Sequence, residues 1–236
     1  MNSEEKERYA RQIMLPEIGE AGQQKIKNAK VLIIGAGGLG SPVALYLTAA
    51  GVGHIGLVDN DKVSLTNLQR QILYNSEVIE KAKVSHAQEV LRTINPNVQI
   101  TPVFERLTGA NAASLIQAYD VIVDATDNFR ARYLISQTCK QEGKPMVHGS
   151  IEEFKGMVSV FNYRGGPAYE DLFPEAPNDQ SFDGAPKGVF GALPGIIGSM
   201  QAMEVLKIIS GAGKILSGKL FVYNAFECTS SIIKLN

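Results

Sequence analysis

A glycine-rich loop and a carboxylate follow two apolar runs early in the chain. The loop, residues 35–40, comes directly after the apolar run 31–34, and Asp59 ends a second apolar run, 55–58. A glycine loop between a strand and a helix lets backbone N–H groups approach phosphates closely. A carboxylate about 20 residues further on is where ribose hydroxyls are held. The pattern favours a nucleotide site over a tight turn without a ligand. The residues that would form this site are Gly35, Gly37, Gly38, Gly40 and Asp59.

Two cations beyond Asp59 are less generic than the glycine loop. Arg70 and Lys83 suit a triphosphate better than a nicotinamide ring, with ordinary surface charge as the alternative for both. For Lys83, which stands near Lys81, surface charge is the stronger interpretation when the residue is taken in isolation. The interpretation of Arg70 and Lys83 as phosphate-binding residues therefore depends on the glycine loop that precedes them.

Asp127 follows the short β-branched run 121–123, at the point where ligands gather in open α/β sheets. Two interpretations have about equal weight on the sequence alone. Asp127 could be a ligand of Mg²⁺, which takes one or two carboxylates together with phosphate oxygens. It could instead cap the N-terminus of a helix over residues 128–142.

Strands and helices alternate over the first 150 residues in the order that positions such a site. Pro42 suits the first turn of a helix after the glycine loop, and Gly51 suits its end. Alternation of this kind implies right-handed crossovers and a parallel sheet. The predicted strands are 31–34, 55–58, 98–103, 121–123 and 145–148, and the predicted later helices are 77–93 and 130–142.

The two ends of the chain have a different character. Residues 3–28 predict a polar helical arm ahead of the first strand. Residues 156–163 alternate like an antiparallel strand with one exposed face. Residues 165–192, rich in Gly, Pro, Asp and Ala, predict a long mobile loop. An apolar helix over 194–209 and a strand over 220–223 follow.

These elements predict an α/β fold with a Rossmann-like mixed sheet. The sheet is expected to be mostly parallel, with antiparallel strands in the C-terminal half and helices on both faces. We expect a single domain over residues 1–236. Within it, 1–30 is the N-terminal arm, 31–150 the nucleotide-binding half, and 151–236 a second half for partner and dimer contacts.

Composition excludes several classes of function. The 236 residues carry a net charge of −1, which gives no reason to expect a nucleic-acid or membrane surface. The charged N-terminus does not resemble a signal peptide, and no apolar run approaches the roughly 20 residues of a membrane span. We therefore expect a cytoplasmic protein. Two cysteines cannot form a disulfide framework or a four-cysteine zinc site.

Eight segments form a joint set of motifs: residues 8–12, 35–40, 57–59, 64–71, 83, 124–128, 156–161 and 195–204. Together they resemble the ThiF/MoeB/HesA family, the bacterial relatives of ubiquitin-activating enzymes. The resemblance covers nearly the whole chain. It implies adenylation, with ATP and Mg²⁺, of the C-terminal glycine of a small ubiquitin-like sulfur carrier that ends in Gly-Gly, with release of pyrophosphate. Such a carrier, ThiS-like or MoaD-like, would serve thiamine or molybdenum cofactor biosynthesis.

The resemblance also implies roles for individual residues. Asp59 would hold the ribose, and Gly38 would back the nucleotide. Arg11 would reach the active site of the other subunit, which requires a homodimer. The implied catalytic residues are Arg11, Arg70, Lys83 and Asp127, with Asp127 as the Mg²⁺ ligand. The implied nucleotide-binding residues are Gly35, Gly37, Gly38, Gly40, Asp59, Asp61, Asn67, Gln69, Arg70, Lys83, Asp127 and Asn128.

The chain departs from the family at its cysteines. Ala168 and Asp171 stand where many members have a zinc-binding Cys-x-x-Cys pair, so we expect no zinc. Residues 181–188 contain no thiol, so we expect no covalent step and a separate sulfur donor. Cys139 is interpreted as a buried inert thiol, whereas Cys228 is left open.

The remaining features are interpreted as structural. The three histidines, His54, His86 and His148, do not cluster with other ligands, so each is expected to be structural or on the surface. An apolar stripe on the late helix is interpreted as core or dimer interface. It consists of Ile196, Ile197, Met200, Met203 and Leu206.

Two other functions compete with adenylation. An NAD-dependent oxidoreductase would account for the glycine loop and Asp59, but leaves Arg70, Lys83 and Asp127 unexplained. A non-catalytic nucleotide-binding scaffold would account for the missing cysteines, but not for the complete phosphate-handling set. The sequence leaves open which sulfur pathway is served and what donates the sulfur.

Overall fold

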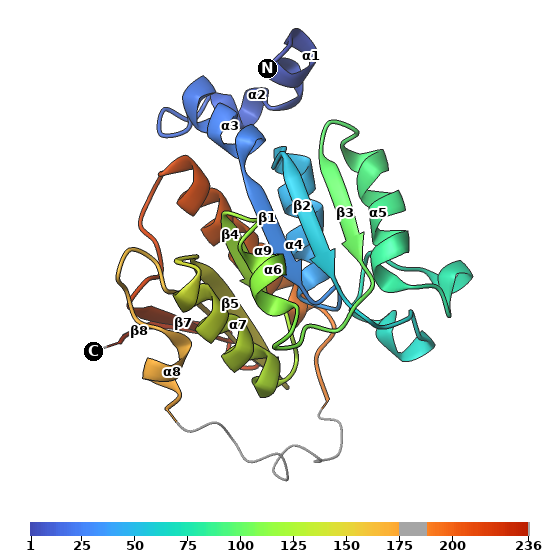
Figure 1. The fold of residues 1–236 in the computed structure, drawn as a ribbon, viewed down its shortest axis with the longest axis vertical. Coiled ribbons are helices and arrows are strands. Elements are labelled where there is room, and N and C mark those ends of the chain that lie inside the picture. Colours follow the sequence, from blue (N-terminus) through green and yellow to red (C-terminus); the bar gives the residue numbers. More distant parts are fainter. Residues whose placement is uncertain (175–187, 236) are drawn as a thin grey trace.

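The computed structural model describes residues 1–174 and 188–235, which form an eight-stranded sheet with helices on both faces (Figure 1). The spatial order of the strands is β3-β2-β1-β4-β5-β6-β7-β8. Strands β3 to β5 in this order are parallel, and β6, β7 and β8 continue the sheet in antiparallel pairs. The mixed Rossmann-like sheet is therefore confirmed. The strands are β1 Lys30–Ile34, β2 His54–Val58, β3 Gln99–Val103, β4 Val121–Asp124, β5 Met146–Glu152, β6 Lys155–Phe161, β7 Lys219–Asn224 and β8 Thr229–Lys234.

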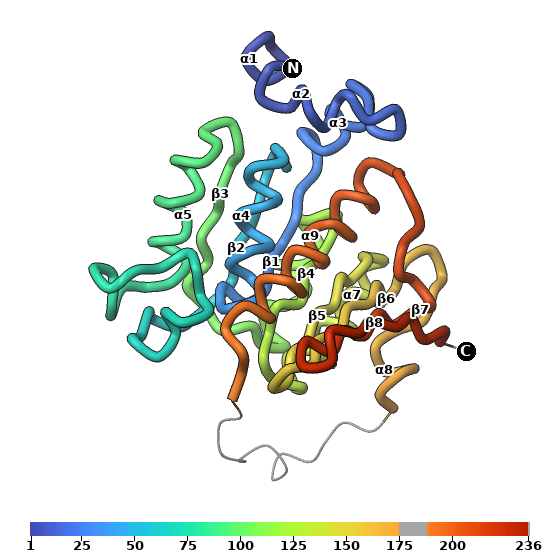
Figure 2. Tube along the Cα trace, turned by 180° about the vertical axis from the view of Figure 1, so that it is seen from behind, coloured from blue at the N-terminus to red at the C-terminus, as the bar shows by residue number. Residues whose placement is uncertain are grey.

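Helices cover the two faces of the sheet in two groups. Helices α4 (Gly40–Ala50), α5 (Lys83–Ile94) and α9 (Leu193–Ser210) lie on one face, which Figure 2 presents to the viewer. Helices α6 (Ala112–Ile116), α7 (Phe129–Gln141) and α8 (Tyr169–Leu172) belong to the other face. The sheet therefore has a separate apolar core on each side.

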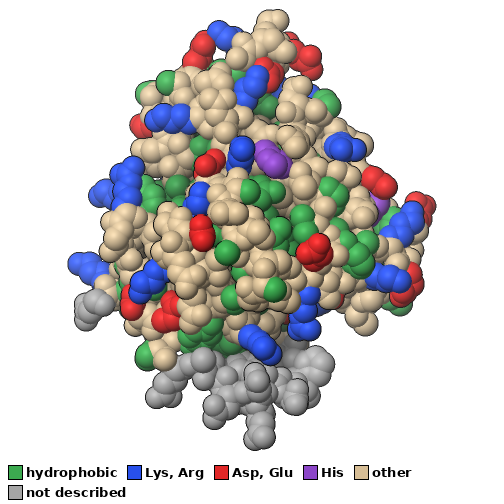
Figure 3. Space-filling view, viewed as in Figure 1, with side chains coloured by type: hydrophobic (Ala, Val, Ile, Leu, Met, Phe, Trp, Pro, Cys, Tyr) green, Lys and Arg blue, Asp and Glu red, His purple; other side chains and the backbone are tan. Residues whose placement is uncertain are grey.

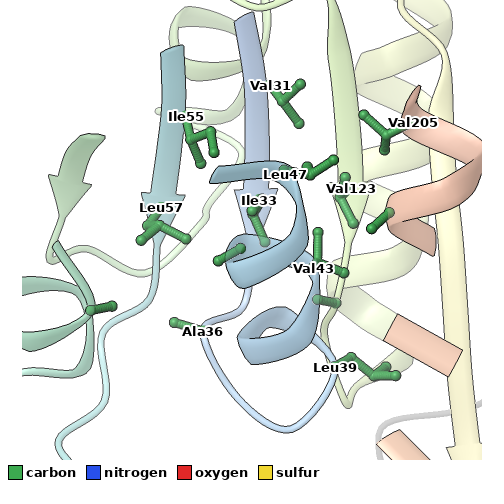
Figure 4. Close-up of a cluster of buried hydrophobic side chains, with 14 of the residues drawn as sticks. Val31, Ile33, Ala36, Leu39, Val43, Leu47, Ile55, Leu57, Val123 and Val205 are labelled. Carbon is green, nitrogen blue, oxygen red and sulfur yellow. The ribbon is translucent and has the colours of Figure 1, made fainter. Parts of the chain in front are cut away.

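The strands supply both cores by alternation. In β1, Val31 and Ile33 enter the core beneath α4, whereas Leu32 and Ile34 enter the core on the opposite face. All four are almost fully buried, which is why this strand reads as a continuous apolar run. Figure 4 shows the first core, in which side chains of β1, β2 and β4 meet Val43 of α4 and Val205 of α9.

The N-terminal arm is helical, as its polar pattern predicts, and it is divided into three helices. It consists of α1 (Ser3–Arg8), α2 (Ala10–Ile13) and α3 (Gly19–Asn28). The chain turns at Gly19, whose φ is +55°. Tyr9 is buried and accepts a hydrogen bond from Asn95 Nδ2 at 2.8 Å, which anchors the arm to the body of the protein.

The predicted helix 77–93 begins too early. The structure has a short 3₁₀ turn, Ser76–Val78, and α5 starts only at Lys83. The backbone of Glu80 and Lys81 pairs with that of Val63, and Glu80 has a φ of +70°. Helix formation is therefore interrupted until this pairing ends.

Further differences lie in the second half. The predicted loop 165–192 contains α8, and its residues 175–187 lie outside the described part of the chain. The last strand, β8, has no counterpart among the predictions. Its residues are exposed on both faces at the edge of the sheet, so their side chains carry no alternating pattern.

The surface carries interspersed charges of both signs. Figure 3 shows Lys and Arg side chains mixed with Asp and Glu over one face. Among the described helices, none combines the length and apolarity needed to cross a bilayer.

Candidate active site

The glycine loop lies where the strand order reverses. Strand β2 follows β1 on one side and β4 flanks it on the other, so the loops after β1 and β4 meet at the carboxyl edge of the sheet. Ligands bind at such switch points in open α/β sheets. A Cβ atom on Gly35, whose φ is +99°, would lie 2.6 Å from the carbonyl oxygen of Ala125. A Cβ on Gly40 would lie 1.9 Å from the Gly35 carbonyl oxygen, so both positions require glycine.

The carboxylate of Asp59 holds the glycine loop against the end of β2. Its two oxygens accept hydrogen bonds from the backbone N–H groups of Ala36 at 2.7 Å and Asp61 at 2.8 Å. Burial raises the pKa of Asp59, while the charge of Lys83 and these hydrogen bonds act in the opposite direction. A carboxylate oxygen can accept more than one hydrogen bond, so Asp59 keeps capacity for a ribose hydroxyl.

Tyr74 is a neighbour of the loop that the sequence reasoning missed. Its buried hydroxyl donates to the Ala36 carbonyl oxygen at 2.7 Å, and burial raises its pKa. Only the tertiary structure brings the two together, because nothing in the local pattern of Tyr74 distinguishes it from a core residue.

Lys83 is not surface charge. The residue is 4% exposed, and its Nζ forms an ion pair with Asp61 Oδ2 at 2.9 Å, while the Asp61 side chain itself is largely exposed. The backbone N–H of Lys83 also donates to the Asp61 carbonyl oxygen at 3.0 Å. The late start of α5 places this cation on the first helical residue, beside the Asp59 carboxylate.

Arg70 reaches the glycine loop from a segment between β2 and α5. Its Cγ would lie 3.4 Å from a Cβ on Gly38, and the ring of Pro194 at the start of α9 would lie 3.2 Å from the same atom. The guanidinium donates to the Thr66 carbonyl oxygen at 3.1 Å. Gly38 therefore lies between Arg70 and the N-terminus of α9.

Asn67 and Gln69 flank Arg70 in the same segment. The Asn67 carbonyl oxygen accepts from the backbone N–H groups of Arg70 and Gln71, which fixes a compact turn. Gln69 lies against Gly191, where a Cβ would approach its carbonyl oxygen to 2.5 Å. Gln71 is buried beside Gly37, and its Oε1 has no partner among the described residues.

Asp127 is exposed in the loop between β4 and α7, and no hydrogen bond joins its side chain to another described residue. The helix cap that was one of the two interpretations of Asp127 belongs to Asn128, whose side-chain oxygen accepts from the Ala131 N–H at 2.9 Å. The capping interpretation of Asp127 is therefore wrong. The expectation that Asn128 binds nucleotide competes with this capping bond.

A buried polar cluster lies directly beneath this loop. Asp124 accepts from the Thr126 N–H at 3.0 Å and from the Thr126 hydroxyl at 2.6 Å through one oxygen. Its other oxygen pairs with His148 Nδ1 at 2.7 Å. Arg132 donates to the Thr126 carbonyl oxygen at 3.3 Å. Burial is the largest single influence and acts to raise the pKa of Asp124, but the combined effect of His148, Arg132 and Thr126 outweighs it, so this pKa is lowered.

Arg11 lies apart from the other predicted site residues. Helices α1 and α2 are fixed to the C-terminal ends of α4 and α5, where Gln12 donates to the Ala50 carbonyl oxygen and Arg8 to that of Ile94. These contacts lie at the amino edge of the parallel strands, opposite the glycine loop (Figure 1). Arg11 is exposed there. It therefore does not reach the site of its own chain.

The thiols and histidines lie as follows. Cys139 is buried, as expected, and burial raises its pKa, whereas Cys228 is exposed. His54 hydrogen-bonds Thr101, and His148 pairs with Asp124. Among the described residues, no three His, Cys, Asp or Glu side chains form a metal cluster.

The apolar stripe on α9 divides between core and surface. Ile197 is fully buried, whereas Met203 is 58% and Ile196 is 40% exposed. The stripe therefore contributes to the core on one side and leaves apolar area on the surface on the other.

Comparison with known proteins places the chain in a family. A model of the ThiF family matches residues 9–236. The sulfur carrier protein adenylyltransferase of Thermus thermophilus is 44% identical over 232 residues, which cover 96% of this chain and 86% of that protein. The adenylyltransferase and sulfurtransferase MOCS3 of Culex quinquefasciatus is 43% identical over 236 residues. The match covers all of this chain and 54% of the MOCS3 protein, so the chain spans about half the length of that relative.

A solved structure shares the fold of this chain. The crystal structure of selenomethionine PaaA superposes with a TM-score of 0.86 at 26% sequence identity, and the match covers 100% of this chain and 75% of PaaA. Because the family model matches nearly the whole sequence and the match covers 86% of the Thermus thermophilus relative, the chain belongs to the ThiF family.

Proposed function

We propose that this protein adenylates the C-terminal glycine carboxylate of a small ubiquitin-like sulfur carrier, using ATP and releasing pyrophosphate. The observation that carries the proposal is the convergence of the glycine loop, Asp59, Lys83 and the β4–α7 loop at one edge of the sheet. The names of the Thermus thermophilus and Culex quinquefasciatus relatives support the same activity. The carrier would serve molybdenum cofactor or thiamine biosynthesis.

The chemistry needs charge stabilisation more than a base. A C-terminal carboxylate has a pKa near 3.5 and is already ionised at neutral pH. Its attack on the α-phosphorus of ATP joins a carboxylate oxygen to the phosphorus and breaks the bond to pyrophosphate. The barrier is the negative charge that gathers on the phosphates, and fixed cations lower it. Lys83, held by Asp61, and Arg70, held by Thr66, are the two cations suited to this role.

Asp127 fits the requirements of a Mg²⁺ ligand. Magnesium in nucleotide sites is bound through one or two carboxylates, with phosphate oxygens and water completing the shell. Asp127 is exposed at the edge of the site and is not engaged elsewhere in the described structure, in contrast to Asp59 and Asp124. When bound, the ion would neutralise phosphate charge.

A homodimer would complete the site. Arg11 lies at the opposite edge of the sheet from its own glycine loop, so its participation requires a neighbouring copy. Exposed apolar side chains on the paired helices α4 and α9, namely Tyr46, Ile196 and Met203, offer area for such contact. Sulfur would come from a separate donor acting on the acyl-adenylate, and the protein would work in the cytoplasm.

The activity is tested by ATP–pyrophosphate exchange. We expect a small protein ending in Gly-Gly to stimulate exchange, and the same protein lacking its last glycine to be inactive. Calorimetry is expected to detect binding of ATP with Mg²⁺ and none of NAD. Binding of NAD without binding of ATP would favour an oxidoreductase, and ATP binding without exchange would favour a scaffold.

The role of Asp127 is tested by two neighbouring substitutions. Asp127→Ala is expected to abolish exchange without loss of stability, because this carboxylate makes no bond within the described structure. Asn128→Ala removes the cap of α7 and is expected to cost about 1 kcal/mol of stability. Exchange by Asp127→Ala at the parent rate would refute the metal role.

A further inference from the structure

Asp127 has no partner of its own in the described structure, so its position depends on the residues around it. The preceding residue, Thr126, is held by three hydrogen bonds. Its N–H and hydroxyl both donate to Asp124 Oδ1, at 3.0 and 2.6 Å, and its carbonyl oxygen accepts from Arg132 at 3.3 Å. The contacts that hold the Asp124 side chain therefore also hold the loop that carries Asp127.

His148 is the partner of the second carboxylate oxygen of Asp124, the one that Thr126 does not use. The two residues are register partners on the adjacent parallel strands β4 and β5, and their side chains meet at 2.7 Å. Asp124 is fully buried and His148 is 1% exposed. The imidazole is enclosed by the rings of Phe161 and Tyr169, with centroids 5.9 and 5.1 Å away.

The burial makes this hydrogen bond necessary. A buried carboxylate without its donors is strongly unfavourable, so it takes up a proton or rotates towards another partner. Either change alters the two bonds from Thr126, because Asp124 uses its other oxygen for them. A donor at the Nδ1 position of His148 is thus connected to Asp127 through two side chains.

We propose that His148 is a positioning residue that holds the β4–α7 loop, and with it Asp127, in the geometry that binds the metal–nucleotide complex. The inference rests on the proposed role of Asp127. It assigns His148 to the site through a chain of hydrogen bonds, His148 to Asp124 to Thr126, without direct contact with the reactants.

A pair of isosteric substitutions separates donation from packing. In His148→Asn, the side-chain amide nitrogen is attached to Cγ as Nδ1 is in histidine, so the donor to Asp124 is retained. His148→Leu has the same branching and no donor. Thr126→Val removes the hydroxyl bond to Asp124 and provides a second route if the leucine variant fails to fold. His54→Leu is the matched control, since His54 bonds Thr101 at the start of β2, at the opposite edge of the sheet.

Two measurements report on the loop without relying on turnover. The first is amide hydrogen exchange at Thr126, and the second is binding of Mn²⁺·ATP followed by electron paramagnetic resonance. For His148→Leu we expect faster exchange at Thr126 and Mn²⁺·ATP binding weakened on the order of tenfold, the usual effect of losing an outer-shell partner. Thr126→Val should weaken binding in the same direction. His148→Asn and His54→Leu should match the parent in both measurements.

Three outcomes would overturn the inference. The first is that His148→Leu has the same amide hydrogen exchange at Thr126 and the same Mn²⁺·ATP affinity as the parent. The second is that His148→Asn is impaired as much as His148→Leu. The third is that Thr126→Val binds Mn²⁺·ATP as tightly as the parent. Failure of the proposed function is distinguishable, because Asp127→Ala would then bind Mn²⁺·ATP normally while Thr126 exchange still responded to His148→Leu.

Discussion

At the scale of single residues, the site depends on charged groups that are held in place by specific partners. Lys83 is held by Asp61, and Asp59 is held by the backbone of the glycine loop. The Asp59 carboxylate and the Lys83 ammonium group are therefore already in place before a ligand binds. Electrostatic catalysis requires this preorganisation. The same principle extends one layer deeper to Asp124 and His148.

His148 also gives the folded protein a pH dependence of stability. Burial lowers the pKa of His148 in the folded state, so the unfolded chain binds the proton first as the pH falls below about 6.5. The contribution of neutral His148 to the free energy of unfolding is fully present above this pH and is lost as the pH falls. The lowered pKa of Asp124 affects stability only at pH values below about 4, the ordinary pKa of an aspartate, and so does not contribute between pH 7 and pH 5.

We therefore expect the parent protein to lose more stability between pH 7 and pH 5 than His148→Asn, as measured by urea unfolding at each pH. His54, whose pKa is also lowered by burial, is present in both proteins and cancels in the comparison. Equal losses in the two proteins would contradict the assignment.

At the scale of elements, two hairpins bring exposed aromatic side chains together. Phe154 lies in the β5–β6 turn, Phe226 in the β7–β8 turn, and Phe190 just before α9. The ring centroid of Phe154 lies 5.5 Å from that of Phe190 and 5.5 Å from that of Phe226. The Phe226 side chain is nevertheless 73% exposed. A cluster of exposed aromatic rings in the second half of the chain is a candidate contact for a protein partner.

Phe226→Asp is expected to raise the KM for the carrier on the order of tenfold, or about 1.4 kcal/mol, with little change in the KM for ATP. Phe226→Tyr keeps the ring and should behave like the parent. The measurement is steady-state ATP–pyrophosphate exchange at varied carrier concentration. An unchanged carrier KM in the aspartate variant would show that this cluster does not contact the carrier.

At the scale of the whole molecule, the sheet separates Arg11 from the site to which the family resemblance assigns it. Within one chain, the glycine loop lies at the carboxyl edge of the sheet, and α2, which carries Arg11, lies at the amino edge (Figure 1). A second copy is the simplest way to bring a guanidinium to the phosphates, as arginine fingers do in other nucleotide enzymes.

Arg11→Ala and Asp127→Ala are each expected to be inactive alone and to recover activity when mixed. In equal mixtures half the dimers are mixed, and each has one complete site, so about a quarter of the parent activity should return. Parent protein mixed with the doubly substituted chain should lose activity, because its partner then lacks Arg11. Absence of recovery despite subunit exchange measured by mass spectrometry would exclude action across the interface.

The sequence by itself determined the parallel half of the sheet and named the residues of the candidate site that lie around the glycine loop. The φ of +99° at Gly35 and the contact between Gly40 and Gly35 lie within the loop, and the apolar run 31–34 reflects burial, so these features could be recognised from the sequence. Asp59 could be identified for the same reason, because its distance from the loop is set by one strand–helix–strand unit.

Only the tertiary structure decided which polar residues meet. The start of α5 at Lys83 depends on the backbone pairing of Glu80 and Lys81 with Val63, which lies well before them in the chain. Edge strand β8 has no burial to create a pattern, and the contact of Asp124 with His148 depends on which strands are neighbours. The spacing of apolar residues in a sequence reflects which side chains are buried. Which polar side chains bind one another depends on how the strands are arranged in the folded sheet.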